Sequence, residues 1–169
     1  MKQFMEITPE EIEENVFQLI SKDWMLVTAK DSDRINTMTA SWGGLGEMWG
    51  KHVSYIVIRP SRYTFSLLEH TDYYTLSFFD EKYRDILNYC GKYSGRDKDK
   101  IKETNLTVLE DGQSAYFSQA KLVLVCKKLY GQMFDPSNFV DSEFGKKMYP
   151  NDDIHKLMIG SIEKVLVAK

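Results

Sequence analysis

The sequence predicts a mainly β fold with inserted helices, most simply an antiparallel barrel. Long apolar segments follow one another in the second half of the chain with little helix between them. A doubly wound parallel sheet would need a crossover helix after each strand. Neither GxGxxG after an expected strand nor GxxxxGK[ST] occurs, so Rossmann and P-loop folds are not indicated. A barrel of antiparallel strands fits this pattern.

Length and composition predict one domain over residues 1–169. The chain has 169 residues, 43% hydrophobic and 13% aromatic, with a formal net charge of -3. This charge excludes the basic surface typical of nucleic-acid binding. The two cysteines, Cys90 and Cys126, form no pairing motif, and the acidic N-terminus has no signal-peptide core. We therefore expect a cytoplasmic protein that contacts no nucleic acid and no membrane.

The elements of the first half follow from capping residues and hydrophobic spacing. Thr8, Pro9 and Glu11 are typical of a helix start, and the apolar residues up to Ile20 predict one helical face. Residues 43–51 hold four glycines and predict either a loop whose backbone closely approaches another group or a flexible connection. The other expected elements are strands over 24–30, 35–42, 52–58 and 72–79, and a short helix over 61–70.

The second half is richer in long strands. Three- and four-residue apolar spacing predicts a helix over 81–93. A helical or loop segment is expected over 142–153. The strands are expected over 106–110, 115–119, 121–134 with a bend at Gly131, and 154–168.

The stretch "RPSRYT" (59–64) gathers hydrogen-bond donors where a strand should pass to a helix. Pro60 ends the strand, and Ser61 is then a natural N-cap. Arg59 and Arg62 add forked donors that suit phosphate oxygens, and Thr64 adds a hydroxyl. The stretch is either a capped helix with solvated arginines or an anion site at a helix N-terminus.

Two further stretches carry polar groups beside glycines. In "NTMTASWGG" (36–44), small side chains on a strand leave room for a flat ligand, with Thr39 and Ser41 as hydrogen-bond partners. In "CGKYSGRDKDK" (90–100), Ser94, Arg96 and Lys100 offer donors. The first stretch is equally compatible with a half-exposed strand, and the second with a helix end followed by a solvated charge run.

No pattern of an activated nucleophile is present, and His155 stands alone near the last strand. The three histidines are far apart and lack metal-site spacing, so no metal is expected. His155 is compatible with a satisfied core or edge residue.

Together these stretches resemble the flavin reductase family. The order is "N-x-M-T-x-S-W", a glycine-rich segment with a tryptophan, a strand ending in "RPSRYT", and then "SGRDKDK". The resemblance covers the chain from about "WMLVTA" to "HKLMIG" and implies an FMN-binding split β-barrel related to flavoredoxin. It also implies a homodimer with FMN at the subunit interface.

The resemblance implies a role for each matching residue. The FMN phosphate would be held by Arg59, Ser61, Arg62 and Thr64, and Ser94 and Lys100 would complete the pocket. The isoalloxazine and ribityl chain would be lined by Asn36, Met38, Thr39, Ala40, Ser41 and Trp42. His155 is the candidate catalytic residue, which would position a nicotinamide.

The implied activity is that of an NAD(P)H-dependent flavin oxidoreductase with NADH or NADPH as reductant and a small-molecule or protein electron acceptor. One departure concerns the nicotinamide end: Ser161 stands where an acidic residue is usual in the family. An FMN electron-transfer protein that takes electrons from a protein partner is therefore the alternative. A split barrel that binds haem or pyridoxal phosphate, or has pyridoxamine-phosphate oxidase-like activity, remains a further interpretation.

Overall fold

The computed structural model describes residues 3–169. Its main feature is a large sheet with the strand order β3-β2-β6-β9-β10-β5-β4, and β1 pairs with β10. Every pairing is antiparallel, which confirms the expected strand arrangement. The strands of the large sheet are β1 (Phe4–Ile7), β2 (Met25–Asp31), β3 (Arg34–Ala40), β4 (Gly43–Met48), β5 (Lys51–Ile58), β6 (Tyr73–Phe78), β9 (Leu122–Met133) and β10 (Lys156–Ala168).

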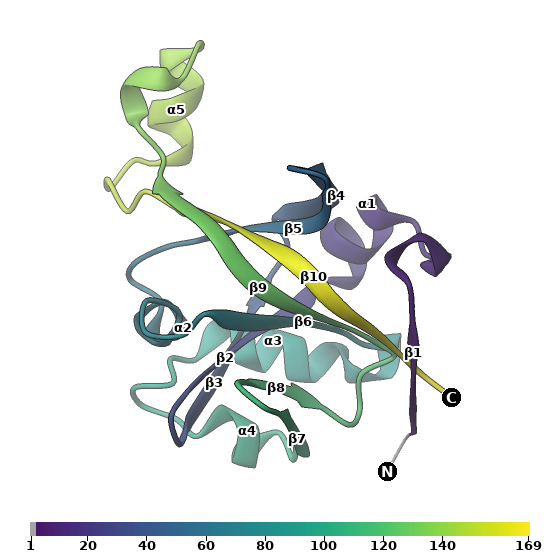
Figure 1. Cartoon of the computed structure of the whole chain (residues 1–169). Helices are drawn as coiled ribbons and strands as arrows, with labels where there is room; N and C mark the ends of the chain where they lie inside the picture. Colours follow the sequence, from purple (N-terminus) through teal and green to yellow (C-terminus); the bar gives the residue numbers. More distant parts are fainter. Residues whose placement is uncertain (1–2) are drawn as a thin grey trace.

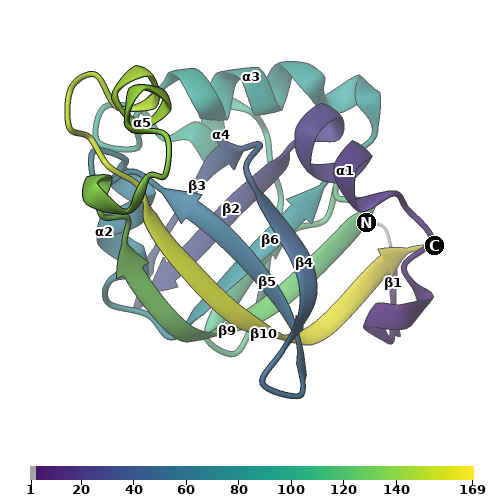
Figure 2. The same ribbon diagram turned by 90° about the horizontal axis from the view of Figure 1, so that it is seen from above.

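The sheet curls on itself, and residues 41–42 join β3 to β4, which are the two ends of the strand order (Figure 2). A separate hairpin consists of β7 (Val108–Asp111) and β8 (Ser114–Phe117). The α-helices are α1 (Val16–Gln18), α2 (Tyr63–Leu68), α3 (Arg84–Lys92), α4 (Lys100–Glu103) and α5 (Ser142–Met148). Short 3-10 turns are η1 (Pro9–Glu11), η3 (Glu81–Tyr83) and η4 (Pro136–Asn138), and η2 (Leu19–Asp23) is a π-helical segment.

Strand β2 is buried on both faces and separates two apolar clusters. Met25 and Val27 belong to the cluster inside the barrel, and Leu26 belongs to a second cluster outside it. Alternate residues of a strand point to opposite faces, so both faces of β2 must be covered. Helix α3 covers the outer face with Leu87 and Cys90, both almost fully buried. This places the C-terminal end of α3 beside the end of β3.

The single helix expected from Thr8 to Ile20 is wrong. Glu11 does accept the Thr8 backbone N–H at 2.7 Å, as a helix start requires, but only the turn η1 follows. The backbone is extended at Ile12 and again at Asn15, whose side chain accepts the Gln18 N–H and caps α1. The helical spacing persists because both turns face the same core, although Asn15 starts a new helix.

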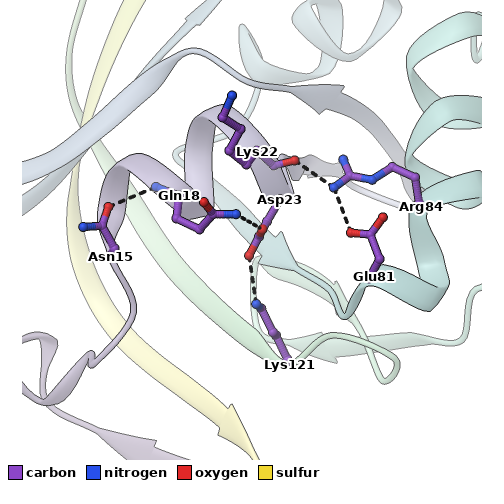
Figure 3. A network of polar contacts seen from close by, with 7 residues as sticks. All are labelled: Asn15, Gln18, Lys22, Asp23, Glu81, Arg84 and Lys121. Atoms are coloured by element: carbon purple, nitrogen blue, oxygen red, sulfur yellow. Dashed lines mark hydrogen bonds and ion pairs between the residues drawn. The ribbon is translucent and has the colours of Figure 1, made fainter.

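A polar network fastens this N-terminal segment to the rest of the barrel (Figure 3). The Asp23 carboxylate accepts from Gln18 Nε2 and from Lys121 Nζ, each at 3.0 Å. Arg84, at the start of α3, donates to the Lys22 carbonyl at 2.7 Å, and its guanidinium lies over the Trp24 ring. The contacts hold α3 at a fixed place against the sheet.

The loop expected over residues 43–51 is also wrong, because this stretch forms β4 and the turn to β5. Gly43 and Gly44 lie directly against β5: a Cβ on Gly43 would meet the Tyr55 carbonyl oxygen at 2.4 Å, and one on Gly44 would meet the Tyr55 ring at 2.2 Å. Trp49 and Gly50 have φ of 55° and 67°, which suits a two-residue hairpin turn. The glycines therefore permit close strand packing.

Strands β9 and β10 are joined by an insertion, residues 134–155, that carries η4 and α5. It extends beyond the end of the sheet (Figure 1). The remaining expected elements are present with shifted ends: the helix over 61–70 is the shorter α2, and residues 142–148 are helical. Among residues 3–169, no helix combines the length and the apolar character needed to cross a membrane.

Candidate functional site

The structure brings the residues predicted to bind a cofactor to one end of the barrel. All of them except Asn36 line two adjoining hollows that share Met38 and Arg62. The first, of about 230 Å³, is called the Trp42 hollow, and the second, of about 350 Å³, the Ser94 hollow. The Trp42 hollow is lined by Met38, Thr39, Ala40, Ser41, Trp42, Val57, Arg59, Arg62 and His155. Predicted residues on the Ser94 hollow are Met38, Ser61, Arg62, Thr64, Ser94 and Lys100.

Asn36 lines a third hollow on the far side of Gly95 and Lys100. The Asn36 side chain is buried and donates through Nδ2 to Thr64 Oγ1 at 2.7 Å. A Cβ on Gly95 would lie 2.1 Å from Asn36 Oδ1. Asn36 and Thr64 therefore support the wall of the Ser94 hollow from behind, and both polar groups already have a partner inside the protein.

The Trp42 hollow lies between a strand end on one side and the aromatic rings of Trp42 and His155 on another. Met38, Thr39 and Ala40 belong to β3, and the chain continues through Ser41 and Trp42 to β4. The Trp42 side chain is 44% exposed, and its ring centroid lies 5.1 Å from that of His155. Thr39 Oγ1 donates to the Leu87 carbonyl of α3. The Thr39 side chain thus fixes the floor of the hollow, and the backbone edge and Ser41 are left beside the open space.

His155 is held as a neutral imidazole. Its side chain is 8% exposed, and Nδ1 lies 2.8 Å from the Tyr149 hydroxyl. Burial, and then the nearby Arg59 charge, lower the pKa of His155 to about 4. Burial also raises the pKa of Tyr149, so this hydroxyl keeps its proton at neutral pH. A phenol that donates to Nδ1 leaves the histidine proton on Nε2.

The Nε2 atom of His155 has no hydrogen-bond partner among the described residues. Among residues 3–169, the only fully buried side-chain polar atom without a hydrogen-bond partner is Ser77 Oγ. Because Nε2 also has no partner, it cannot be fully buried and must be in contact with open space, and His155 lines the Trp42 hollow. This nitrogen can offer one N–H donor to a ligand there.

Two guanidinium groups meet at the junction of the hollows. Arg62 Nη2 donates to the Gly91 carbonyl at 3.1 Å. Burial, and then the positive charge of Arg59, lower the pKa of Arg62. Within residues 3–169, no carboxylate lies at ion-pair distance from Arg62. A bound anion would relieve this unbalanced positive charge.

The prediction that Ser61 caps a helix is wrong. Helix α2 begins at Tyr63, and Arg62 occupies the N-cap position without a side-chain cap. The reason is a turn in which the Arg62 N–H donates to the Arg59 carbonyl at 3.0 Å, which delays the helix. Ser61 Oγ instead donates to Asp153 Oδ2 at 2.6 Å. The donors of "RPSRYT" are thus displayed on a turn.

The segment 91–100 closes the Ser94 hollow. Lys100 is 3% exposed and donates from Nζ to the Cys90 carbonyl at 3.1 Å. Burial lowers the pKa of Lys100 to about 8. Ser94 Oγ accepts the Arg96 N–H at 3.1 Å, and its hydroxyl proton remains available. This segment therefore adds donors from a part of the chain distant from "RPSRYT".

Two cationic residues of the Ser94 hollow, Lys92 and Arg96, are absent from the cofactor site predicted from the sequence. Arg96 Nη1 donates to the Ser61 carbonyl at 3.0 Å, and its guanidinium lies over the Tyr63 ring. The sequence offers Arg96 as a donor, but the aspartates interleaved in "GRDKDK" are equally typical of a solvated surface. Gly95 is the sequence feature that indicates a close approach, because a side chain at this position would collide with Asn36 and Tyr63.

The hollows together suit a flat ligand with an anionic tail. The Trp42 hollow offers apolar surface, backbone and a neutral imidazole, and the Ser94 hollow offers hydroxyls and cations. Forked guanidinium donors beside hydroxyls are the groups that bind phosphate well. The donor set therefore fits a phosphorylated flavin.

Comparisons with known proteins agree with this geometry. The family model described as flavin reductase like domain matches residues 17–169. No curated protein matches the sequence significantly. One similar solved structure is an FMN-binding domain of a flavin reductase-like enzyme from Shewanella baltica, with a TM-score of 0.71 and 14% identity over 98% of this chain and 78% of that chain.

Two further solved structures have the same fold. Flavoredoxin of Desulfovibrio vulgaris gives a TM-score of 0.68 and 20% identity over 95% of this chain and 76% of that chain. Nitrilotriacetate monooxygenase component B from Bacillus cereus gives a TM-score of 0.69 and 15% identity over 100% of this chain and 84% of that chain. These likenesses confirm the expected fold, that of the flavin reductase-like split β-barrels.

Proposed function

Because the chain belongs to the flavin reductase-like family, we propose that it binds FMN and is an oxidoreductase that moves electrons from NADH or NADPH to flavin. The observation that carries the proposal is the junction of the Trp42 hollow, which has aromatic and backbone walls, with the cationic Ser94 hollow. FMN has the matching shape and charge, with a planar ring at one end and a phosphate at the other. FMN-binding proteins among the structural neighbours support the assignment.

In this proposal the chain binds and orients, because cofactors carry the redox chemistry. When bound, the flavin supplies hydride and electron transfer. Arg62, Arg96 and the Ser94 hydroxyl hold the phosphate by charge-assisted hydrogen bonds. The strand end at Met38 and its continuation to Trp42 present backbone groups to the polar edge of the ring.

His155 positions the second substrate in this proposal. In the tautomer in which the Tyr149 hydroxyl donates to Nδ1, the proton of His155 is on Nε2 and is donated into the Trp42 hollow. Because burial lowers the pKa of His155 to about 4, the imidazole donates a hydrogen bond without acting as an acid near neutral pH. A nicotinamide carboxamide oxygen is a suitable acceptor. Hydride transfer itself needs no protein acid.

The second candidate is an electron-transfer protein that binds FMN and takes electrons from a protein partner. It is favoured by Ser161, which stands at the position where an acidic residue is usual in the family. The Ser161 hydroxyl donates to Glu163 at 2.5 Å. The presence of a flavoredoxin among the neighbours also supports it. The electron acceptor in either case is a small molecule or a protein.

The test is the visible absorption spectrum of the purified protein with FMN, followed by anaerobic addition of NADH and then NADPH. A bound-flavin band that bleaches with either nucleotide supports the reductase. A bound-flavin band that persists supports the electron carrier. If the protein shows no bound flavin after incubation with FMN, the proposal fails.

We also propose that the protein forms a homodimer and is cytoplasmic. Large exposed apolar side chains lie on β5 and β9, the two neighbours of β10 in the sheet: Tyr55 is 41% and Tyr130 43% exposed, and both are in register with Ile159 of β10. Trp49, 61% exposed, lies 6.3 Å from Tyr130 between ring centroids. A second copy would cover these rings. Light scattering during gel filtration tests the dimer.

The proposed cytoplasmic location is supported by the two buried cysteines, which are free thiols as expected in a reducing compartment.

A further inference from the structure

Asp153, in the insertion just before β10, reaches the donors of the "RPSRYT" turn. Its Oδ2 accepts the hydrogen bond from Ser61 Oγ at 2.6 Å and lies 3.7 Å from Arg59 Nη1. The Asp153 side chain is 30% exposed. A carboxylate is therefore placed beside Arg59 and Ser61, two of the residues that the family resemblance assigns to the phosphate of FMN.

The arginines around the two hollows differ in charge balance. Arg62 donates to the Gly91 carbonyl and Arg96 to the Ser61 carbonyl, and neither has a carboxylate partner within the described part of the chain. These two guanidinium groups are free to hold an anion. Arg59, which lines the Trp42 hollow together with Arg62, differs because its charge is partly balanced by Asp153.

The serine hydroxyl has a single proton to donate. While Ser61 donates it to Asp153, Ser61 cannot donate to a phosphate oxygen. A carboxylate also repels a phosphate, and at a separation of a few ångströms in a partly solvated site this repulsion remains significant. A primary alcohol behaves differently, because its own O–H can donate to the Asp153 carboxylate.

We propose that Asp153 sets the balance between phosphorylated and unphosphorylated flavin, weakening the binding of FMN relative to riboflavin. The inference rests on the proposed flavin site and adds its substrate class: both FMN and riboflavin enter, and the Asp153 carboxylate decides their ratio. Without this charge, the Ser61 and Arg59 donors would turn to the phosphate.

The direct test is the substitution Asp153→Asn, with Asp152→Asn as the matched control. An asparagine at 153 keeps an oxygen acceptor for Ser61 and removes the charge. Asp152 is exposed and has φ of 55°, a conformation that asparagine also adopts. Dissociation constants for FMN and for riboflavin are measured by quenching of flavin fluorescence.

We expect Asp153→Asn to bind FMN about tenfold more tightly, from the loss of one nearby like charge in a partly screened site. Riboflavin binding stays within about twofold or weakens, since the alcohol loses a charged acceptor. Asp152→Asn leaves the ratio of the two constants unchanged. The variant Asp153→Ala, which also frees the Ser61 hydroxyl, gives the same direction and covers the case in which the asparagine variant folds poorly.

The outcomes separate this inference from the function on which it rests. If the native protein binds neither flavin, both are overturned. If the native protein binds flavin but the FMN-to-riboflavin ratio is the same in the Asp153 variants, the role of Asp153 is wrong and the flavin site stands. An equal shift in Asp152→Asn would reduce the effect to general surface charge and would also overturn the inference.

Discussion

Replacement of Gly95 by alanine tests whether the wall between the two chain segments of the site is as tight as the structure shows. A Cβ at this position would lie 2.1 Å from Asn36 Oδ1 and 2.6 Å from Tyr63 Cδ1. The Asn36 amide is buried, and its hydrogen bond to Thr64 Oγ1 measures 2.7 Å. Although Oδ1 is the end of a side chain, this hydrogen bond restrains the amide from moving away.

The expected loss of stability follows from these contacts. Overpacking a tight site costs about 1–3 kcal/mol, and disturbing a buried hydrogen bond adds about 1 kcal/mol. We therefore expect Gly95→Ala to lower the free energy of unfolding by about 2–4 kcal/mol. With a urea dependence of about 2 kcal/mol per M, the unfolding midpoint falls by about 1–2 M.

Urea unfolding followed by circular dichroism measures this effect, with Gly46→Ala as the control. A Cβ on Gly46, which lies in β4, would meet no atom within 4 Å. We expect that control to change stability by less than about 0.5 kcal/mol. Equal midpoints for the two variants would show that the segment 91–100 moves aside without strain, and the argument for a tightly closed Ser94 hollow would fail.

Three other measurements test the site. Arg62→Ala should weaken FMN binding by about 10- to 100-fold in fluorescence titrations, with a much smaller effect on riboflavin, because a charge-assisted contact to phosphate is lost; equal effects on both flavins would contradict it. Burial lowers the pKa of Lys100 from its ordinary value of 10.5 to about 8 in the folded protein, so between these values this group binds its proton more in the unfolded chain and contributes a rise of the free energy of unfolding with pH. Burial raises the pKa of Cys90 and of Cys126, which acts in the opposite direction in native protein and in Lys100→Met alike, so the quantity to measure is the difference in free energy of unfolding between these two proteins; it should shift in favour of the native protein by about 2 kcal/mol between pH about 7.5 and about 10, and an unchanged difference would contradict the effect. Tyr149→Phe should move the His155 ring from the Nε2–H form toward a tautomer mixture in nitrogen NMR spectra, with His52 as the unchanged reference; an unaltered His155 spectrum would dismiss the tautomer assignment.

The long strands were predictable because their own residues determine them. In β9, residues 122–126 are all buried, and β10 contains two runs of apolar residues, 157–159 and 165–168, that mark a buried strand. The stretch 43–51 was not predictable, since glycine composition is the same in a flexible loop and in a strand packed under Tyr55. The break between η1 and α1 was hidden for a related reason: the apolar spacing continues across Asn15, which begins a new helix.

The candidate site was predictable as a set of motifs and less so as a geometry. "RPSRYT" contained the right donors, but its helix starts later than expected because of the turn at Arg59. The contribution of Arg96 depends on its approach to Ser61 across 35 residues of sequence. Because aspartates alternate with the basic residues in "GRDKDK", the sequence does not distinguish this contact from a solvated surface, and it is identified only in the folded chain.

The hydrogen bonds divide the site residues into two groups with different expected phenotypes. Asn36 and Thr39 donate hydrogen bonds inside the protein, to Thr64 Oγ1 and to the Leu87 carbonyl, and the buried Thr64 accepts the first of them. Their substitution should alter folding and flavin binding together, because they set the shape of the hollows. Arg62 and Ser94 retain donors that the protein does not use, so their substitution should affect ligand binding with little change in stability. A residue assigned to the site by its motif can therefore belong to either group, and the internal hydrogen bonds decide which.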